Sequence, residues 1–310
     1  MRYAATLTFA LALTPSAALA QSTALEPLTS PETLADMGDA GVLVLDIRGD
    51  AYSDGHIPGA VSAPYGLFRG PAENPGELIS EERLTEVLRE AGVETDRPTI
   101  IVHQGDSETD FGAAARVYWT LKSAGVENLS ILNGGMVAWM ADAGREVSTE
   151  PVTVAASEIE VTFSDEWLAT REDVLAVVEG EDDARLVDAR PQAFWEGEES
   201  HPAAARAGTL PQSEYFTHSR WFASGPAIVD AEAARALATE NGFEAGDELI
   251  SFCNTGHWAA TNWFALNELA GVEDVKLYPE SLVGWSNADL PMDNTPGLIE
   301  NLFDTITGDR

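Results

Sequence analysis

The sequence predicts an α/β protein made of two similar domains, each a mainly parallel sheet with helices on both faces. Three observations lead to this prediction. The chain has 310 residues, enough for about two domains of ordinary size. Short apolar runs alternate with helical patterns. The two halves also repeat one another: AGVE at 124–127 recurs at 270–273, and DIR at 46–48 corresponds to DAR at 188–190.

In the first half, the apolar runs at residues 42–46, 100–103 and 129–132 predict strands. Residues 81–91 and 111–124 show the apolar period of helices. Because helices separate the strands along the chain, we expect a parallel sheet that helices cover on both faces.

The second half repeats this order, with predicted strands at 185–188, 249–253 and 275–278 and helices at 231–241 and 259–270. Between the halves, residues 145–159 contain a proline and many small or polar residues without a long periodic pattern. We therefore expect an N-terminal domain at 24–145, a linker at 146–159, a C-terminal domain at 160–295 and a tail at 296–310.

The first 20 residues predict a Sec-type signal peptide. Arg2 precedes a short apolar run, and small residues ending at Ala20 provide a cleavage site before Gln21. That run is too short to cross a bilayer, and no later stretch reaches the roughly 20 apolar residues that a membrane helix needs. We expect an exported protein that does not insert into a membrane, periplasmic in a Gram-negative cell.

The composition is strongly acidic, with 17 Lys and Arg against 52 Asp and Glu and a formal net charge of −35. Such a chain would repel nucleic-acid phosphates, so nucleic acid is excluded as a partner. A single cysteine, Cys253, excludes an intramolecular disulfide and any multi-cysteine metal site.

Cys253 ends a predicted strand, a turn of five residues follows, and a helix begins near Ala259. The backbone N–H groups of this turn should converge on one point and, with the helix dipole, favour an anion. A thiolate there would be stabilised and nucleophilic, and the same donors could hold a persulfide. The alternative is an inert buried cysteine.

In their order along the chain, these motifs resemble the tandem-domain rhodanese family. The first half carries DIR at 46–48, GHIPGA at 55–60 and NGGMVAW at 133–139. The second half carries DAR at 188–190, GTLP at 208–211 and CNTGHWA at 253–259. The resemblance covers residues 26–295 and implies two rhodanese-like domains in a thiosulfate or 3-mercaptopyruvate sulfurtransferase, with the catalytic site in the second.

The repeat places His103 where the second half has Cys253, and the following loop looks five residues longer before the match resumes at Ala114. We therefore expect an inactive first domain that supplies scaffold and half of the cleft.

Two other classes of cysteine enzyme are disfavoured. A Cys-dependent phosphatase needs the pattern Cys-x5-Arg, in which a guanidinium holds the phosphoryl group, and here that position is Ala259. No sequence pattern assigns a histidine as the base of a cysteine protease.

Other residues would bind the donor's anion. The resemblance makes Arg190, at the end of a predicted strand, the anion-binding arginine, with a solvated surface arginine as the alternative. Many relatives have a further arginine where this chain has Phe194. Arg206 is a candidate substitute, unless it only forms a surface salt bridge. The loop supplies the remaining substrate-binding candidates, Asn254, Thr255, Gly256, His257 and Trp258, and we expect His257 to donate a hydrogen bond to the substrate.

In mercaptopyruvate-using relatives, a serine at the third loop position is thought to act with a histidine of the N-terminal domain. Thr255 and His56 match these positions, so they are candidates for a proton relay. The alternatives are a loop hydrogen bond for Thr255 and a structural turn residue for His56. Trp258 and Trp285 could wall the cleft, although aromatic residues at such spacings are more often core.

The residues favour a double displacement. Cys253 takes sulfur from a small anionic donor, stores it as a persulfide and passes it to a thiol or cyanide acceptor, with a thioredoxin-like protein among the candidate acceptors. Neither a metal nor an organic cofactor is required. The alternatives are a non-enzymatic persulfide carrier in a periplasmic sulfur oxidation or uptake system and a purely structural module.

The donor is the most open choice. The hydroxyl of Thr255 favours 3-mercaptopyruvate, whereas export favours thiosulfate, because mercaptopyruvate is a cytoplasmic metabolite. We prefer thiosulfate, and expect its use to improve as the pH falls through the titration of His257.

Overall fold

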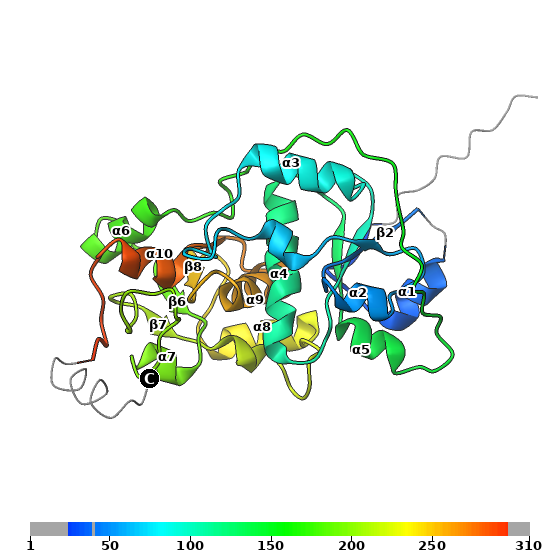
Figure 1. Cartoon of the computed structure of the whole chain (residues 1–310). Helices are drawn as coiled ribbons and strands as arrows, with labels where there is room; N and C mark the ends of the chain where they lie inside the picture. Colours follow the sequence, from blue (N-terminus) through cyan, green and yellow to red (C-terminus); the bar gives the residue numbers. More distant parts are fainter. Residues whose placement is uncertain (1–23, 39–40, 297–310) are drawn as a thin grey trace, which may run out of the picture.

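The structure is a computed structural model that describes residues 24–38 and 41–296. The predicted signal peptide and nearly all of the predicted tail lie outside the described residues. Two parallel sheets, one in each half of the chain, are joined by packed helices in a single body (Figure 1). The predicted α/β class and the two mainly parallel sheets are confirmed.

The N-terminal sheet has five strands in the order β1-β5-β4-β2-β3. Its strands are β1 (Leu28–Thr29), β2 (Leu43–Asp46), β3 (Val61–Ser62), β4 (Thr99–Val102) and β5 (Leu129–Leu132). The helices of this domain are α1 (Pro31–Met37), α2 (Ala51–Asp54), the 3-10 helix η1 (Tyr65–Phe68), α3 (Glu81–Glu90), α4 (Glu108–Ser123) and α5 (Gly135–Met140). The three central strands are buried along their whole length, which explains why most of their residues are apolar without the alternation of a half-exposed strand.

The C-terminal sheet has four strands in the order β7-β6-β8-β9. They are β6 (Arg185–Asp188), β7 (Glu214–Tyr215), β8 (Leu249–Phe252) and β9 (Val275–Leu277). The helices are α6 (Arg171–Glu179), α7 (Gln192–Trp195), the 3-10 helix η2 (His218–Trp221), α8 (Ala231–Glu240), α9 (Trp258–Phe264), its π-helical continuation η3 (Ala265–Ala270), and α10 (Ser281–Asn287).

Strand register brings the motif residues to one edge of each sheet. Asp46 pairs with Val102 in the first sheet, and Asp188 pairs with Phe252 in the second. The residues that follow, His103 and Cys253, therefore leave the carboxyl ends of β4 and β8, where parallel sheets bind ligands.

The two domains share one hydrophobic core. Helix α4 packs against α9, and Phe111 and Tyr118 of α4 contact the ring of Phe264, with centroids 5.6 and 5.0 Å away. At the edge of this contact, Tyr118 donates to Glu268 at 2.9 Å and Lys122 pairs with the same carboxylate at 2.7 Å. The domain interface is thus an apolar core with a polar rim.

The connection between the domains crosses the N-terminal domain as an extended segment, seen in green above α3 in Figure 1. Residues 151–164 form neither helix nor strand. Backbone pairing of Ser148 with His56 at 2.8 Å and a bond from Arg89 to the carbonyl of Ile159, also 2.8 Å, fix the segment. Within the described residues, no helix has the length and apolar character needed to span a bilayer.

Candidate active site

Cys253 lies at the start of a five-residue loop, here called the cysteine loop (residues 253–257), between β8 and α9. The backbone N–H groups of Cys253 and Gly256 donate to the hydroxyl of Ser281, at 3.0 and 3.2 Å. Ser281 in turn donates to the carbonyl of Tyr278 at 2.8 Å. One buried side chain thus fixes the loop from inside, and sequence reasoning missed it. The repeat could have found Ser281, because it lies 146 residues after Gly135, as Trp285 does after Trp139.

The remaining loop N–H groups are available to an anion. Among the described residues, the backbone N–H groups of Asn254, Thr255 and His257 have no hydrogen-bond acceptor. The predicted convergence on sulfur therefore needs a correction: the N–H groups of Cys253 and Gly256 serve Ser281, and the other three remain for a thiolate or persulfide.

The loop's carbonyl groups bind two arginines of the N-terminal domain. Arg69 Nη2 donates to the carbonyl of Thr255 at 2.8 Å, and Arg116 Nη1 lies 3.3 and 3.4 Å from the carbonyls of Thr255 and Gly256. Burial, and secondarily the charge of Arg69, lower the pKa of Arg116 to about 9. Gly256 has a φ of +67°, and a Cβ there would lie 2.6 Å from the backbone oxygen of Pro279 and would also clash with Arg116, so only glycine fits.

His257 faces the N-terminal domain. Its Nε2 lies 2.7 Å from the carbonyl of Thr109 and its Nδ1 lies 3.0 Å from the hydroxyl of Tyr65. Since a carbonyl only accepts, Nε2 carries the proton and Tyr65 donates to Nδ1. Burial, and then the charge of Arg69, lower the pKa of His257 to about 4. Both ring nitrogens are thus occupied by the N-terminal domain, which leaves no place for the predicted hydrogen bond from His257 to substrate. With its pKa lowered, the ring is not expected to titrate near neutral pH, so we no longer expect a gain in thiosulfate use from it there.

Aromatic rings flank the start of α9. Trp258 stacks on His218 with centroids 5.1 Å apart and planes 8° apart, and contacts Phe194 at 5.7 Å. Burial lowers the pKa of His218, whose Nδ1 lies 2.9 Å from the carbonyl of Ala189. Sequence reasoning missed His218, which lies in a segment without a motif. Trp285, in contrast, is fully buried in the core.

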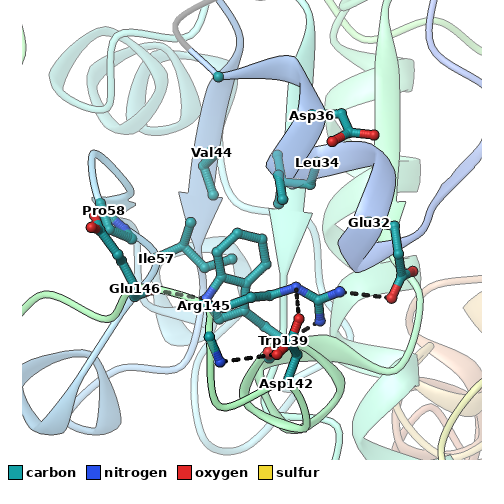
Figure 2. A pocket seen from close by; sticks show the side chains of 13 residues that line it. Glu32, Leu34, Asp36, Val44, Ile57, Pro58, Trp139, Asp142, Arg145 and Glu146 are labelled. Atoms are coloured by element: carbon teal, nitrogen blue, oxygen red, sulfur yellow. Dashed lines mark hydrogen bonds and ion pairs between the residues drawn. The ribbon is translucent and has the colours of Figure 1, made fainter.

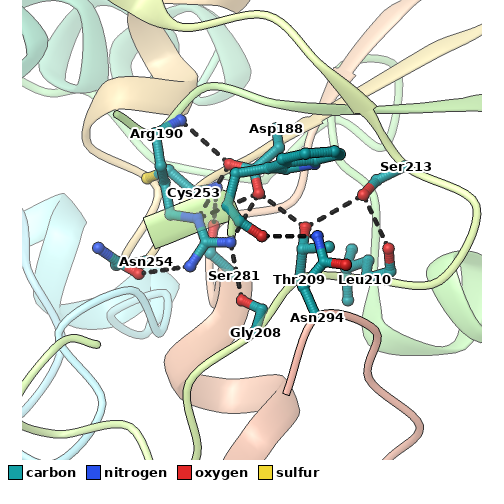
Figure 3. Close-up of polar contacts among 11 residues, drawn as sticks. Asp188, Arg190, Gly208, Thr209, Leu210, Ser213, Cys253, Asn254, Ser281 and Asn294 are labelled. Carbon is teal, nitrogen blue, oxygen red and sulfur yellow. Dashed lines mark hydrogen bonds and ion pairs between the residues drawn. The ribbon is translucent and has the colours of Figure 1, made fainter. Parts of the chain in front are cut away.

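Arg190 forms an internal ion pair instead of an open anion site (Figure 3). Its guanidinium donates to Asp188 at 2.7 Å, to the carbonyl of Gly208 at 2.8 Å and to Asn254 Oδ1 at 3.3 Å. The side chain is 2% exposed, and its Nε, Nη1 and Nη2 all donate within the protein.

The N-terminal domain contains the same network without a cysteine. Arg48 donates to Asp46 at 2.7 Å, to the carbonyl of Gly55 at 2.6 Å and to Gln104 at 3.2 Å. Because the domain that lacks Cys253 keeps this arrangement, the network serves the fold. The predicted substrate contacts of Arg190 and Asn254 are therefore corrected to a role in positioning the cysteine loop.

Two further predicted groups lie elsewhere. His56 is fully buried, with Nδ1 2.9 Å from the carbonyl of Tyr52 and Nε2 3.1 Å from that of Glu150. Both ring nitrogens are thus occupied by backbone, and the predicted relay from His56 to Thr255 is wrong. The hydroxyl of Thr255 itself has no partner among the described residues.

Arg206 binds the C-terminal segment, not the cysteine loop. Its Nη2 donates to the carbonyl of Leu290 at 2.6 Å and lies 3.4 Å from the carboxylate of Asp289. Its predicted role as a substitute anion-binding arginine is therefore not supported by its position.

The structure places His103 at the position equivalent to Cys253. Its carbonyl accepts from Met136 at 2.9 Å, as that of Cys253 accepts from Leu282 at 3.0 Å. The expected longer loop is wrong, because both helices begin five residues on and the extra residues lengthen α4. Asp110 fills this loop, since its carboxylate accepts from His103 Nδ1 at 2.8 Å and from a backbone N–H of the loop.

A separate cavity of about 700 Å³ opens on the N-terminal domain between α1 and α5 (Figure 2). Arg145 crosses it, bound to Glu32 at 2.6 Å and lying over the ring of Trp139. No residue of the cysteine loop lines this cavity, so it is separate from the candidate active site.

Comparison with known proteins identifies relatives over most of the chain. The "Sulfur carrier protein TtuD" of Thermus thermophilus is 30% identical over 263 residues, which cover 80% of this chain and 89% of the relative. The 3-mercaptopyruvate sulfurtransferase of Escherichia coli K12 is 30% identical over 245 residues, covering 78% and 84%. An anaerobic ergothioneine biosynthesis enzyme from Chlorobium limicola shares the fold, with a TM-score of 0.76 at 20% identity, covering 86% of this chain and 70% of its own.

The family assignment comes from matches in both halves. The rhodanese-like domain matches residues 30–142 and again residues 170–288, the two segments that contain the parallel sheets. The homologues include a sulfurtransferase and a sulfur carrier, so the general class predicted from the sequence is confirmed. The chain belongs to the rhodanese family, as a tandem of two rhodanese-like domains.

Proposed function

We propose that this protein is a sulfurtransferase that carries sulfane sulfur on Cys253. The observation that carries the proposal is the cysteine loop, in which the only cysteine of the chain is followed by three backbone N–H groups without an acceptor among the described residues. Its carbonyl groups are bound by two cationic side chains, so the loop lies in a positive environment despite the net charge of −35.

The reaction balances without an added oxidant or reductant. The Cys253 thiolate attacks the outer sulfur of thiosulfate, the donor's sulfur–sulfur bond breaks, and sulfite leaves with the bonding electrons. The enzyme then holds a persulfide, Cys253–S–S⁻. An acceptor thiolate or cyanide attacks the outer sulfur, and the Cys253 thiolate leaves.

Thiosulfate is our preferred donor, for a chemical reason. Sulfite leaves as a stable anion, whereas pyruvate leaves mercaptopyruvate as an enolate that must be protonated. A relay from His56 would supply that proton, but both nitrogens of His56 bind backbone carbonyls. The free hydroxyl of Thr255 is the feature that favours mercaptopyruvate.

A persulfide carrier is the second candidate, because one relative is named a sulfur carrier protein. The burial of Cys253 favours small-molecule acceptors, because the residue is 1% exposed and a thiol on a protein would have to enter the loop to reach it. A carrier loads once and then waits for a protein acceptor, whereas an enzyme turns over with small acceptors.

Intact mass after incubation with thiosulfate, or in a parallel sample with 3-mercaptopyruvate, tests the proposal. We expect an increment of one sulfur, lost on addition of cyanide with formation of thiocyanate, and no increment in Cys253→Ser. Loading of the serine variant would contradict the mechanism. Loading without turnover on small acceptors would favour the carrier.

We also propose export to the periplasm, which rests on the N-terminal sequence alone. Expression of the full chain in a Gram-negative host should give a periplasmic protein whose first residue is Gln21. A cytoplasmic protein that keeps residues 1–20 would contradict this proposal.

A further inference from the structure

Two arginines of the N-terminal domain bring uncompensated positive charge to the cysteine loop. The chain has 52 acidic residues against 17 Lys and Arg, yet neither Arg69 nor Arg116 has a carboxylate within 4 Å among the described residues. Their contacts with the loop are to carbonyl oxygens, which leave the full positive charge in place. A cation left without a counter-ion beside a nucleophile is suited to bind an anionic reactant.

The two arginines differ in their exposure. Arg116 is fully buried, with Nη1 on the loop carbonyls and Nη2 donating to the carbonyl of Gly76 at 3.0 Å, and its Nε, which has no partner among the described residues, is enclosed in the core. Arg69 is partly exposed, and only its Nη2 is used, by Thr255. Its Nη1 is enclosed and has no partner among the described residues. Arg69 therefore has a free donor close to the loop.

The surroundings of Arg69 hold its guanidinium in place. The group lies over the ring of Tyr65, 5.2 Å from the centroid, and the Tyr65 hydroxyl bonds to His257 of the cysteine loop. Burial, and then the charge of Arg69, lower the pKa values of His257 and His201. Arg69 and Arg116 are therefore the two cationic groups in contact with the cysteine loop, and of the two only Arg69 is partly exposed to an anion from solvent.

We propose that Arg69 binds the anionic end of the sulfur donor, so that the active site is shared between the two domains. This inference rests on the proposed function. It gives the N-terminal domain a direct part in donor binding, and it assigns to Arg69 the task for which Arg190 and Arg206 are not placed. The expected ligand is a sulfonate or carboxylate group joined to a sulfane sulfur.

Alkylation of Cys253 tests the anion site without any sulfur transfer. Iodoacetate and iodoacetamide alkylate a thiolate by the same displacement of iodide, and only iodoacetate is an anion. Because the chain has one cysteine, intact mass reports the rate directly. We expect Arg69→Ala to lower the iodoacetate-to-iodoacetamide rate ratio by about 10- to 100-fold, the loss typical of one charge-assisted hydrogen bond. Arg69→Lys, which keeps the charge, should lose less.

Arg83→Ala is the matched control, because Arg83 is a half-exposed arginine of the same domain that pairs with Glu86 on α3. It should keep the wild-type ratio. An unchanged ratio in folded Arg69→Ala protein, checked by its Tm, would overturn the assignment.

Donor kinetics separate this inference from the proposed function. If wild type loads sulfur, Arg69→Ala should raise the KM for thiosulfate with a smaller change in kcat, and an unchanged KM would contradict the inference. If wild type takes no sulfur from any donor, the proposed function fails, while the alkylation ratio still decides whether Arg69 binds anions.

Discussion

The hydroxyl of Ser281 lies 3.0 Å from the backbone nitrogen of Cys253 and 3.2 Å from that of Gly256, so one side chain links the first and fourth residues of the cysteine loop. Ser281 has a φ of +50°, which is unfavourable for a residue with a Cβ. The equivalent residue of the N-terminal domain is Gly135. The second domain therefore accepts backbone strain in exchange for a hydroxyl that satisfies two buried N–H groups.

Two substitutions at Ser281 separate strain from hydrogen bonding. Ser281→Ala keeps the backbone strain and leaves two buried N–H groups without a partner. The free energy of unfolding should fall by about 1–3 kcal/mol for each N–H group that water does not reach. Ser281→Gly removes the strain as well and should cost about 1 kcal/mol less. Urea denaturation measures both, and sulfur loading should slow in each variant. Loading at the wild-type rate in both would show that the hydroxyl does not position the cysteine.

A cysteine placed in the N-terminal domain should stay inactive. In the double variant His103→Cys with Cys253→Ser, the new thiol occupies the position equivalent to Cys253, but the carboxylate of Asp110 already binds that loop. A second anion next to this carboxylate would be repelled. We expect no mass increment with thiosulfate, with Cys253→Ser alone as the control. A one-sulfur increment would show that the loop of the first domain can still hold a persulfide.

Arg190 and Arg48 should behave alike in stability and differ in chemistry. Each is a buried partner of an aspartate, so Arg190→Met and Arg48→Met should each lower the free energy of unfolding by about 3–5 kcal/mol. Only Arg190 touches Asn254 of the cysteine loop, so only its loss should slow loading per folded molecule. If Arg190→Met instead raised the KM for thiosulfate at unchanged stability, Arg190 would be a donor-binding group after all.

His257 should make the protein sensitive to acid. Its pKa is lowered to about 4 in the folded state against 6.5 for an ordinary histidine, so the unfolded chain binds more protons between these values. The contribution is present in full above about pH 6.5 and is lost as the pH falls toward 4. Urea denaturation at pH 7 and 4.5 should show that wild type loses about 2 kcal/mol more than His257→Gln.

The same shift predicts how turnover depends on pH. Because His257 stays neutral, kcat/KM for thiosulfate should show no step from this residue between pH 5.5 and 8. An inflection in that range that disappears in His257→Gln would contradict the assigned neutral ring.

The sequence predicted the fold well where local pattern decides it. The strands at 129–132 and 185–188 were predicted to the residue, because apolar runs between turns mark buried strands. The site was predicted less well, because its contacts are made between segments far apart in the chain. Arg69 belongs to no recognisable motif, and its place at the site follows from its contact with Thr255 of the other domain.

For Arg190 the sequence motif predicted the position correctly and the partner wrongly. Its guanidinium binds Asp188, two residues earlier, instead of a substrate anion. His257 was misjudged for a similar reason, since the loop sequence does not show that Thr109 and Tyr65 approach from the first domain. A motif therefore predicts the position of a residue in the fold, whereas the contacts of its side chain depend on segments that are distant in the sequence.

The aromatic contact of Phe111 and Tyr118 with Phe264 has a consequence for the chain as a physical unit. If the chain were cut in the linker and the halves separated, each would expose to water a large apolar face that the other now covers. Although the sequence is a duplication, neither copy should be independently soluble. A single calorimetric transition is therefore expected for the whole protein, and aggregation for either half expressed alone.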